Sequence, residues 1–474
     1  MKKILLLLTF VSSFAAFGDA DSDKFLNKID AFSYWLGEPL QERLYLKEKA
    51  YKNFYRLAQF ALDDYITNPV NGWVVKEMAN FDNYNNRVAF PTDHIETNNF
   101  GDRKYVLKQG YYFISKKFGG RTIKLIATPY RISPFNDVEY GVGIYYAEKD
   151  FKYAKEFMSD VFNYLTTKNI YKNAVIHRVK MGWIWTYRFL ENVGNYKYTW
   201  DDLILDPELK IKSMNSTSNF IKNLPALSKY GIKLKRGVVL AGPPGTGKSF
   251  LGQILISQIL HNDLKKKSTL ITVTARHLTD ISTVKALFSA ARNLSPSIIF
   301  MEDIDLLGIK KRKLGGNSSG NKSTFKASIL NEFLNEMDGV AESNGVLVIG
   351  TTNKEKDLDG ALLRSGRLGV HFFYGYPAHG IRKKFFTRYA TKGVAWEAGV
   401  TTDWLAGLSE RLSGADIIEA ISMAKQMAYL DDSWIGKDLY ITRSYFKKAM
   451  ATVGSKSEQL VKQNLSYKDA LNLL

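Results

Sequence analysis

The sequence predicts an α/β protein: a doubly wound parallel sheet, preceded by an α+β domain and followed by a helical region. Three observations lead to this fold class. An apolar run at 238–240 is followed at once by a glycine-rich loop and a helical stretch. Four further apolar runs then alternate with helical stretches, which is typical of a parallel sheet with helices on both faces. From Gly380 to the end of the chain the pattern is helical.

The N-terminal segment 1–20 has the pattern of a signal peptide or a membrane anchor. Lys2 and Lys3 precede an apolar stretch from Ile4 to Phe17, and small residues follow it. This stretch is short for a helix that crosses a membrane. A buried N-terminal helix is the alternative, and the sequence leaves open whether the segment is cleaved.

Residues 21–199 are predicted to form an α+β domain. The stretch from Asp23 to about Thr67 has helical spacing, and a second helix is expected over 151–165, whose aromatic stripe we interpret as core. Gly119-Gly120 joins two of the expected strands as a hairpin. The expected strands are 105–115, 121–132, 175–180 and 183–189.

The core, 200–379, begins its sheet with the run at 238–240, and the glycine-rich loop follows directly. Glycines let backbone N–H groups turn toward phosphate oxygens, and the helix N-terminus directs its positive end at the same anion. Lys248 can reach the β- and γ-phosphates of a nucleoside triphosphate, and the Ser249 hydroxyl can ligate Mg²⁺. The predicted nucleotide-binding residues are Gly242, Pro243, Pro244, Gly245, Thr246, Gly247, Lys248, Ser249 and Phe250.

Two carboxylates, Glu302 and Asp303, end the apolar run 298–301. In a parallel sheet this strand end lies beside the phosphate loop, where Mg²⁺ and the attacking water must be managed. Two carboxylates on an apolar strand cost desolvation free energy unless they serve a purpose such as this. We expect Glu302 to help hold the metal together with Ser249, and Asp303 to polarise the water.

Asn353 and two arginines complete the candidate site. Asn353 follows the apolar run 346–349, where an amide could orient the water or contact the γ-phosphate. Arg364 and Arg367 lie three residues apart on an expected turn. They could be ordinary surface charges. In a ring of subunits they could instead reach the γ-phosphate of a neighbour, the arginine-finger role.

In their order and spacing these motifs resemble those of the AAA ATPase family. The likeness runs from about Trp200 to about Met427, roughly half of the chain. The matching segments are the phosphate loop at 242–249, IIFMEDID at 298–305, LNEFLNEMDGV at 330–340, TTN at 351–353, ALLRSGR at 361–367 and SGAD at 413–416.

The resemblance implies a P-loop ATPase core with a C-terminal helical lid over 380–474, usually assembled as a hexameric ring. It implies ATP and Mg²⁺ as cofactors and a protein as substrate. It also places the adenine near Asp202, Leu203, Gly231 and Ile232. Because an ATPase needs a compartment that contains ATP, an export signal at 1–20 would conflict with the core, and the localisation stays open.

Three departures from the family pattern narrow the resemblance. Glu302 precedes Asp303, whereas the family usually has Asp before Glu, which shortens the reach to the water by one methylene. Residues 274–283 lack the aromatic-apolar-glycine triplet with which threading ATPases grip an unfolded chain. Gly369 replaces the acid that commonly follows the second arginine.

The Rieske-protein translocases share the first two features and carry a non-protease domain before the ATPase, so the chain resembles that branch and its bacterial relatives most. The sequence has no His-Glu-x-x-His, the motif of the membrane-bound AAA zinc proteases.

The absence of cysteine excludes disulfides, thiol catalysis and Cys-ligated zinc. The net charge of +19 is not accompanied by a nucleic-acid-binding signature, which argues against nucleic acid as partner. Our main hypothesis is an AAA-type ATPase that remodels or translocates a protein, and membrane association through 1–20 is one of the interpretations that the sequence leaves open for that segment. Two alternatives remain: an ATP-gated scaffold with little turnover, and a nucleic-acid-dependent motor.

Overall fold

The computed structural model describes residues 28–37, 45–49, 57–81, 87–88, 92–107, 110–132, 139–181, 184–231, 235–265, 267–307, 320–339, 345–391 and 393–454. The chain divides into two compact units, one of 1–172 with 179–191 and one of 173–178 with 192–474. The leader expected at 1–20 lies outside the described residues. Over the described ranges, no helix has the length and apolar character needed to span a bilayer.

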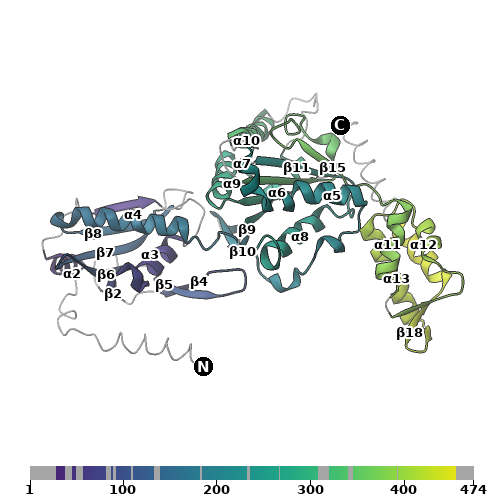
Figure 1. Cartoon of the computed structure of the whole chain (residues 1–474), viewed down its shortest axis with the longest axis horizontal. Helices are drawn as coiled ribbons and strands as arrows, with labels where there is room; N and C mark the ends of the chain where they lie inside the picture. Colours follow the sequence, from purple (N-terminus) through teal and green to yellow (C-terminus); the bar gives the residue numbers. More distant parts are fainter. Residues whose placement is uncertain are drawn as a thin grey trace. The chain divides into compact units, whose positions relative to one another are not determined.

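The first unit is built on a six-stranded antiparallel sheet with the strand order β1-β8-β7-β6-β2-β3 (Figure 1). The expected hairpin is confirmed, because Phe118 pairs with Arg121 across Gly119-Gly120. The bounds of the strands of this unit are β1 (Tyr45–Lys49), β2 (Val74–Phe81), β3 (Arg87–Val88), β4 (Thr92–Glu96), β5 (Arg103–Leu107), β6 (Tyr111–Phe118), β7 (Arg121–Ile132), β8 (Glu139–Tyr146) and β10 (Ile184–Phe189).

Helices pack on both faces of this sheet. The helix α2 (Lys28–Leu36) buries Phe32 against Phe113, whereas α3 (Leu57–Thr67) and α4 (Phe151–Thr167) pack together and contact β8. The helical expectation for 23–67 is therefore wrong in its middle. Residues 45–49 form the edge strand β1, because backbone pairing with β8 overrides the local helical spacing there.

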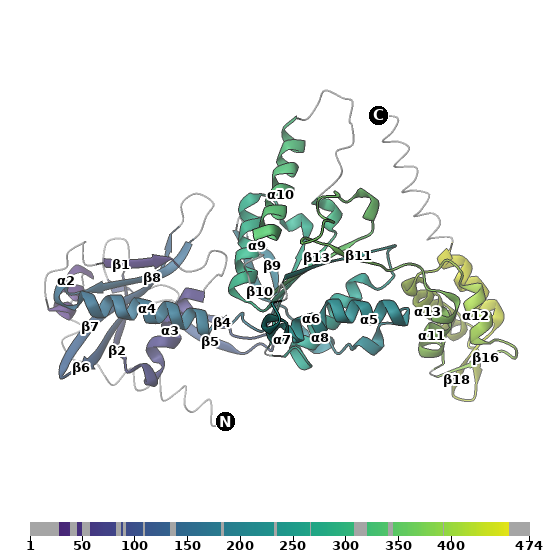
Figure 2. The ribbon, with the colours of Figure 1, turned by 45° about the horizontal axis from the view of Figure 1, so that its top comes forward.

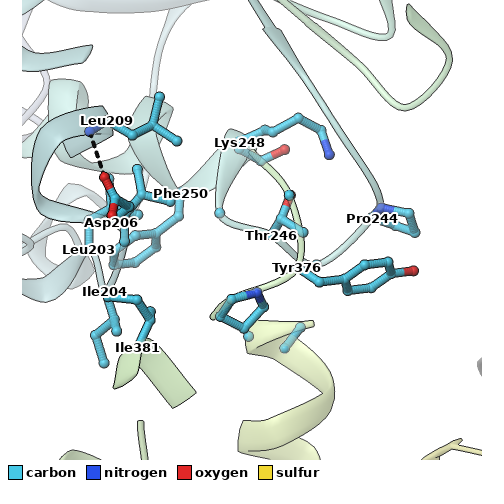
Figure 3. A pocket seen from close by; sticks show the side chains of 18 of the residues that line it. Leu203, Ile204, Asp206, Leu209, Pro244, Thr246, Lys248, Phe250, Tyr376 and Ile381 are labelled. Carbon is cyan, nitrogen blue, oxygen red and sulfur yellow. Dashed lines mark hydrogen bonds between the residues drawn. The ribbon is translucent and has the colours of Figure 1, made fainter. Parts of the chain in front are cut away.

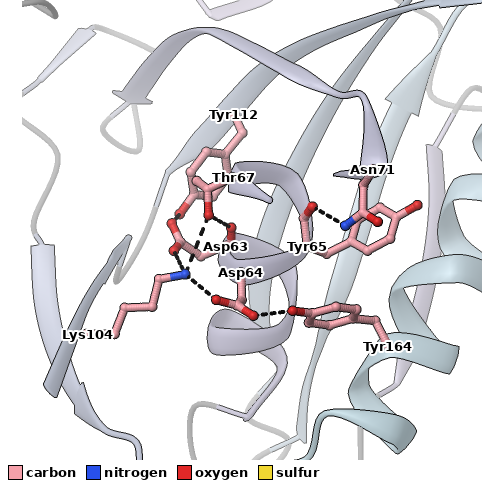
Figure 4. Close-up of polar contacts among 8 residues, drawn as sticks. All are labelled: Asp63, Asp64, Tyr65, Thr67, Asn71, Lys104, Tyr112 and Tyr164. Carbon is pink, nitrogen blue, oxygen red and sulfur yellow. Dashed lines mark hydrogen bonds and ion pairs between the residues drawn. The ribbon is translucent and has the colours of Figure 1, made fainter. Parts of the chain in front are cut away.

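A polar network joins α3, α4, β6 and the separate hairpin β4–β5 (Figure 4). The Lys104 Nζ lies 3.0 Å from Asp63 Oδ2 and 2.7 Å from Asp64 Oδ1. The Tyr112 hydroxyl donates to Asp63 Oδ1 at 2.9 Å, and the Tyr164 hydroxyl donates to Asp64. These buried and half-buried polar groups are thus satisfied within the unit, which is what a stable fold requires of them.

The second unit carries the predicted parallel sheet, and the fold class is confirmed. Its strands follow the order β9-β12-β13-β14-β11-β15, and every pair in this run is parallel. The unexpected member is β9, because sequence patterning had assigned its residues to the preceding domain. The bounds are β9 (Val175–Met181), β11 (Lys235–Ala241), β12 (Thr269–Thr274), β13 (Ser297–Glu302), β14 (Val346–Thr352) and β15 (Val370–Phe373).

Helices cover both faces of the parallel sheet, as double winding requires. Figures 1 and 2 show α9 (Ile281–Asn293) and α10 (Gly320–Gly339) on one face and α8 (Lys248–His261) on the other. Phe288 of α9 and Phe333 of α10 meet edge to face with ring centroids 5.3 Å apart. Three short helices precede β11 in the chain: α5 (Pro207–Ser216), α6 (Ser218–Lys222) and α7 (Leu224–Lys229).

The C-terminal region has its own core, and a small sheet joins its helices. The helices are α11 (His379–Tyr389), α12 (Thr402–Leu408), α13 (Gly414–Leu430) and a helix over 443–454. The three strands, in the order β16-β18-β17, are β16 (Val394–Trp396), β17 (Trp434–Ile435) and β18 (Asp438–Ile441). The all-helical expectation is thus incomplete. A two-residue turn at Gly436-Lys437 pairs β17 with β18, and Gly436 adopts the left-handed conformation that such turns need.

Candidate functional site

The glycine-rich loop lies between the end of β11 and the start of α8, as the sequence predicted. Two of its glycines are required by what surrounds them. A Cβ on Gly242, whose φ is +145°, would lie 2.1 Å from the Tyr374 carbonyl oxygen. A Cβ on Gly245, whose φ is +76°, would lie 2.4 Å from the Ser413 hydroxyl. Only glycine therefore permits this path of the loop.

Lys248 folds back over the loop from the first position of α8. Its side chain is buried, and its Nζ donates to the carbonyl oxygens of Gly242 at 2.7 Å and Pro243 at 2.5 Å. Burial lowers the pKa of Lys248 to about 8, although the charge of Asp303 acts in the opposite direction. A buried ammonium group that meets mainly neutral carbonyls is a favourable site for an anion.

A cavity of about 760 Å³ opens beside Lys248 (Figure 3). This volume lies within the usual range of ligand pockets, roughly 300–1,000 Å³. Most of the predicted site residues line this cavity. Among the described residues, four predicted ones are not part of its lining: Gly242, Pro243, Arg364 and Arg367. The predicted residues that line it are Pro244, Gly245, Thr246, Gly247, Lys248, Ser249, Phe250, Glu302, Asp303 and Asn353.

The two carboxylates reach this cavity from the carboxyl end of β13. Glu302 is the last residue of the strand, and Asp303 follows with a φ of +55°. Aspartate and asparagine tolerate this left-handed conformation better than other non-glycine residues, and it is often found where a site fixes the backbone. Asp305 accepts a hydrogen bond from the Thr352 hydroxyl at 2.9 Å, which ties this turn to the end of β14 beside Asn353.

The donor groups fit a magnesium ion that arrives with phosphates. Ser249, Glu302 and Asp303 face one cavity, and the described residues contain no group of three or more His, Cys, Asp or Glu that could hold a metal alone. Magnesium characteristically keeps several waters and binds through one or two carboxylates together with substrate phosphates. The residues present therefore match this mode of binding.

The structure separates the two arginines that sequence spacing had paired. The Arg364 side chain is exposed and makes no hydrogen bond or ion pair with the described residues. Arg367 instead forms a fork with the Asp338 carboxylate, through Nε at 3.0 Å and Nη2 at 2.7 Å, and donates to the Ala361 carbonyl oxygen at 2.9 Å.

The lid closes one side of the cavity with the start of α13. The Ala415 N–H donates to the Gly245 carbonyl oxygen at 3.0 Å, so the lid touches the phosphate loop directly. The Ser413 hydroxyl accepts from the Asp416 N–H, and the Ser413 N–H in turn donates to the Asp416 carboxylate at 2.9 Å, which forms a capping box. Gly414 and Ala415 line the cavity as a result.

Another part of the cavity lining is the segment in which the resemblance placed the adenine. Asp202 and Leu203 line the cavity, and so do Ile204 and Leu205. Sequence reasoning missed the last two, because two apolar residues in a short extended segment carry no motif. Gly231 is not among the lining residues, and Ile232 falls outside the described residues.

Comparison with known proteins matches this site to a family. Residues 238–376 match the sequence model of the "ATPase family associated with various cellular activities (AAA)". The chain therefore contains an AAA ATPase domain. The matched range includes the phosphate loop, both carboxylates, Asn353 and both arginines. ATP with Mg²⁺ is the cofactor pair of this family.

Individual relatives match the chain over longer stretches than this domain, from 225 to 272 residues. The chain is 28% identical over 272 residues to the "ATPase family gene 2 protein" of Saccharomyces cerevisiae, covering 57% of this chain and 33% of that protein. It is 31% identical over 247 residues to the "Mitochondrial inner membrane m-AAA protease component YTA10" of the same yeast, covering 50% and 30%. It is 32% identical over 225 residues to the "ATP-dependent zinc metalloprotease YME1L" of Drosophila melanogaster, covering 46% and 28%. The chain thus spans about a third of the length of these curated relatives.

Proposed function

We propose that this protein is a Mg²⁺-dependent ATPase that couples ATP binding and hydrolysis to the remodelling or translocation of a protein partner. One observation carries the proposal. A single cavity brings together the buried Lys248 with its glycine loop, the Ser249 hydroxyl and the carboxylates of Glu302 and Asp303. Phosphoryl transfer needs these parts: an anion cradle, a metal ligand and a group that manages the attacking water.

Each residue takes a distinct part in the proposed reaction. The loop and Lys248 hold the β- and γ-phosphates, and Ser249 with Glu302 would hold Mg²⁺, which supplies positive charge to the phosphate oxygens. Asp303 orients a water for in-line attack on the γ-phosphorus, and Asn353 holds that water or a γ-oxygen. The Asp305–Thr352 hydrogen bond keeps the turns that carry Asp303 and Asn353 in register.

We propose that a ring of subunits, a hexamer as in much of the family, completes the site. The Arg364 guanidinium is exposed and outside the cavity of its own chain. A neighbouring protomer could bring it to the γ-phosphate, where it would offset transition-state charge. Arg367 is held by Asp338 inside the protomer, so we assign the finger to Arg364 and a positioning role to Arg367.

The proposed substrate is a protein that is moved rather than cut. The names of two relatives identify them as a protease component and a protease, so a protein is the substrate class that the comparisons support. The Glu302–Asp303 order and the missing gripping triplet at 274–283 support a function like that of the Rieske-protein translocases. The pattern of residues 1–20 supports membrane tethering, with the ATPase core on a side that contains ATP.

Phosphate release by the purified full-length protein tests this proposal against its alternatives. Turnover should depend on Mg²⁺ and rise with protein concentration as the ring assembles. Binding of ATP without turnover at any concentration would favour the scaffold, for which the shorter Asp303 is the structural argument. Stimulation by DNA or RNA that weakens steeply with salt would favour the nucleic-acid motor. The protein that co-purifies with the Asp303→Asn variant would identify the partner.

A further inference from the structure

A strap, which we define as residues 199–206, runs between the phosphate loop and the lid. Leu203 is buried and faces the loop, because its Cδ1 would lie 3.1 Å from a Cβ built on Gly247. Ile204, the next residue, packs against the buried lid cluster that contains Phe385. Successive side chains of the strap thus contact the two parts of the protein that must enclose a nucleotide.

Both ends of the strap are also fixed locally. Asp206 caps α5 by accepting from the N–H groups of Glu208 at 3.0 Å and Leu209 at 3.1 Å. Asp202 accepts from the Thr199 N–H at 2.7 Å and from its hydroxyl at 3.0 Å. These bonds shape the strap, but they do not attach it to the lid.

Arg388 of α11 makes the polar attachment between strap and lid. Its Nη1 donates to the Asp201 carbonyl oxygen at 3.0 Å, and its Nη2 pairs with the Asp202 carboxylate. A planar guanidinium can make both bonds at once, which an ammonium group cannot do in the same geometry. The following residue, Tyr389, lines the cavity, and the Arg388 guanidinium lies 5.9 Å from its ring centroid.

The contact of Arg388 with the strap lies beside the cavity, and the neighbouring part of the cavity lining indicates which part of a ligand this contact affects. Phosphates belong at Lys248 and Ser249, where the charge is. The wall formed by the strap and the lid is apolar and aromatic, a surface that suits the ring of a base. Its side chains include Leu203, Ile204, Phe385, Tyr389 and Ile418.

We infer that Arg388 is a positioning residue for the nucleotide base: by bracketing Asp201 and Asp202 it sets the separation of the strap and the lid wall between which the base is held. The inference rests on the proposed function, since it assumes a nucleotide in this cavity. It predicts that Arg388 contributes to the affinity for a nucleotide and not to the affinity for a bare phosphate chain.

Calorimetric titration of the full-length protein with ADP and with inorganic tripolyphosphate, both with Mg²⁺, separates these contributions. Arg388→Ala should weaken ADP binding about fivefold to tenfold, as expected for the loss of a half-exposed charged pair that orders a wall, and should leave tripolyphosphate binding unchanged. Arg388→Lys should recover part of the loss. The control is Lys383→Ala on the same helix, whose Nζ pairs with Asp403 at 2.9 Å within the lid and should affect neither ligand.

The pattern of losses decides the outcome. Equal affinities of Arg388→Ala and the parent protein for ADP would overturn the inference and leave the proposed function intact. An equal loss for both ligands would also overturn it, because Arg388 would then support the whole site or the fold. If the parent protein binds neither ligand, the proposed function fails and the inference fails with it.

Discussion

Arg367 is bonded to Asp338 of the same chain through two of its guanidinium nitrogens, Nε at 3.0 Å and Nη2 at 2.7 Å. The third nitrogen, Nη1, donates to the Ala361 carbonyl oxygen. These contacts of Arg367 hold the turn after β14 against the end of α10. Arg364, three residues earlier, is exposed and makes no side-chain bond to the described residues. Two arginines of one motif therefore have different surroundings and are expected to have different effects when removed.

We expect Arg367→Ala to lower the free energy of unfolding by about 1 kcal/mol, because it removes a forked charge-assisted pair that is partly exposed. Arg364→Ala should leave stability unchanged and should reduce turnover by about 1,000-fold or more, because arginine fingers contribute about 10³ to 10⁵ to turnover. Urea unfolding and phosphate release measure the two effects. A fully active Arg364→Ala together with a normally stable Arg367→Ala that has lost turnover would reverse our assignment.

Asp303→Asn should retain ATP binding and lower turnover by about 100-fold or more, because the amide cannot accept a proton from the attacking water. Asparagine is the matched replacement at this position, since it tolerates a φ of +55°. Alanine would add backbone strain to the chemical change and so confuse the result. Nucleotide affinity and phosphate release should be measured on the same preparation. Hydrolysis at the parent rate would show that Asp303 does not act on the water.

The sequence predicted the parts of the core that follow from local pattern. The parallel sheet, the loop between β11 and α8, and the positions of Glu302 and Asp303 at a strand end all follow from apolar runs and their spacing. The place of β9 beside β12 could not be predicted in this way, because paired residues such as Val175 and Leu270 lie 95 positions apart in the chain. The bond between Arg388 and Asp202 likewise joins residues 186 positions apart. Long-range pairing of this kind leaves no trace in a local window.

Gly245→Ala should separate the lid from the phosphate loop. Its Cβ would lie 2.4 Å from the Ser413 hydroxyl, and alanine is strained at a φ of +76°. We expect nucleotide affinity to fall by about tenfold or more, since both the loop and the start of α13 must move. Gly380→Ala is the control: it lies in α11, and no atom lies within 4 Å of its added Cβ. A Gly245→Ala variant with parent affinity would mean that the contact between loop and lid is not needed for binding.

Lys104→Met tests the polar network of the first unit. The pKa of Asp64 lies below its ordinary value. Burial alone would raise this pKa, but hydrogen bonds from Lys104 and Tyr164 lower it by more than burial raises it. A carboxylate whose folded-state pKa is depressed stabilises the fold above its unfolded-state pKa and loses this effect as the pH falls through the folded value. We therefore expect Lys104→Met to lower the free energy of unfolding by about 1 kcal/mol at neutral pH, and by less once Asp64 is protonated. Urea unfolding at neutral pH and at about pH 2 makes the comparison, and an equal loss at both would exclude the ionic contribution.

The affinity for ATP should depend on pH through Lys248. Burial lowers the pKa of Lys248 to about 8, so that raising the pH through this value neutralises the ammonium in the nucleotide-free protein. Bound phosphates favour the charged form and raise this pKa, because opposite charges then lie close together. Binding above about pH 8 must therefore take up a proton, and the dissociation constant should rise by up to about tenfold per pH unit. The phosphate groups themselves do not titrate in this range, since their pKa values lie near 6.

Calorimetry at about pH 9 in two buffers of different ionisation enthalpy measures this proton uptake directly. Lys248→Arg is the matched control, because a guanidinium stays charged at every pH used, and its residual binding should show no uptake. Lys248→Ala should bind no nucleotide. If the parent protein binds ATP equally well at pH 7 and pH 9 without taking up a proton, then Lys248 is not the group that meets the phosphates, and the assignment of the whole loop is wrong.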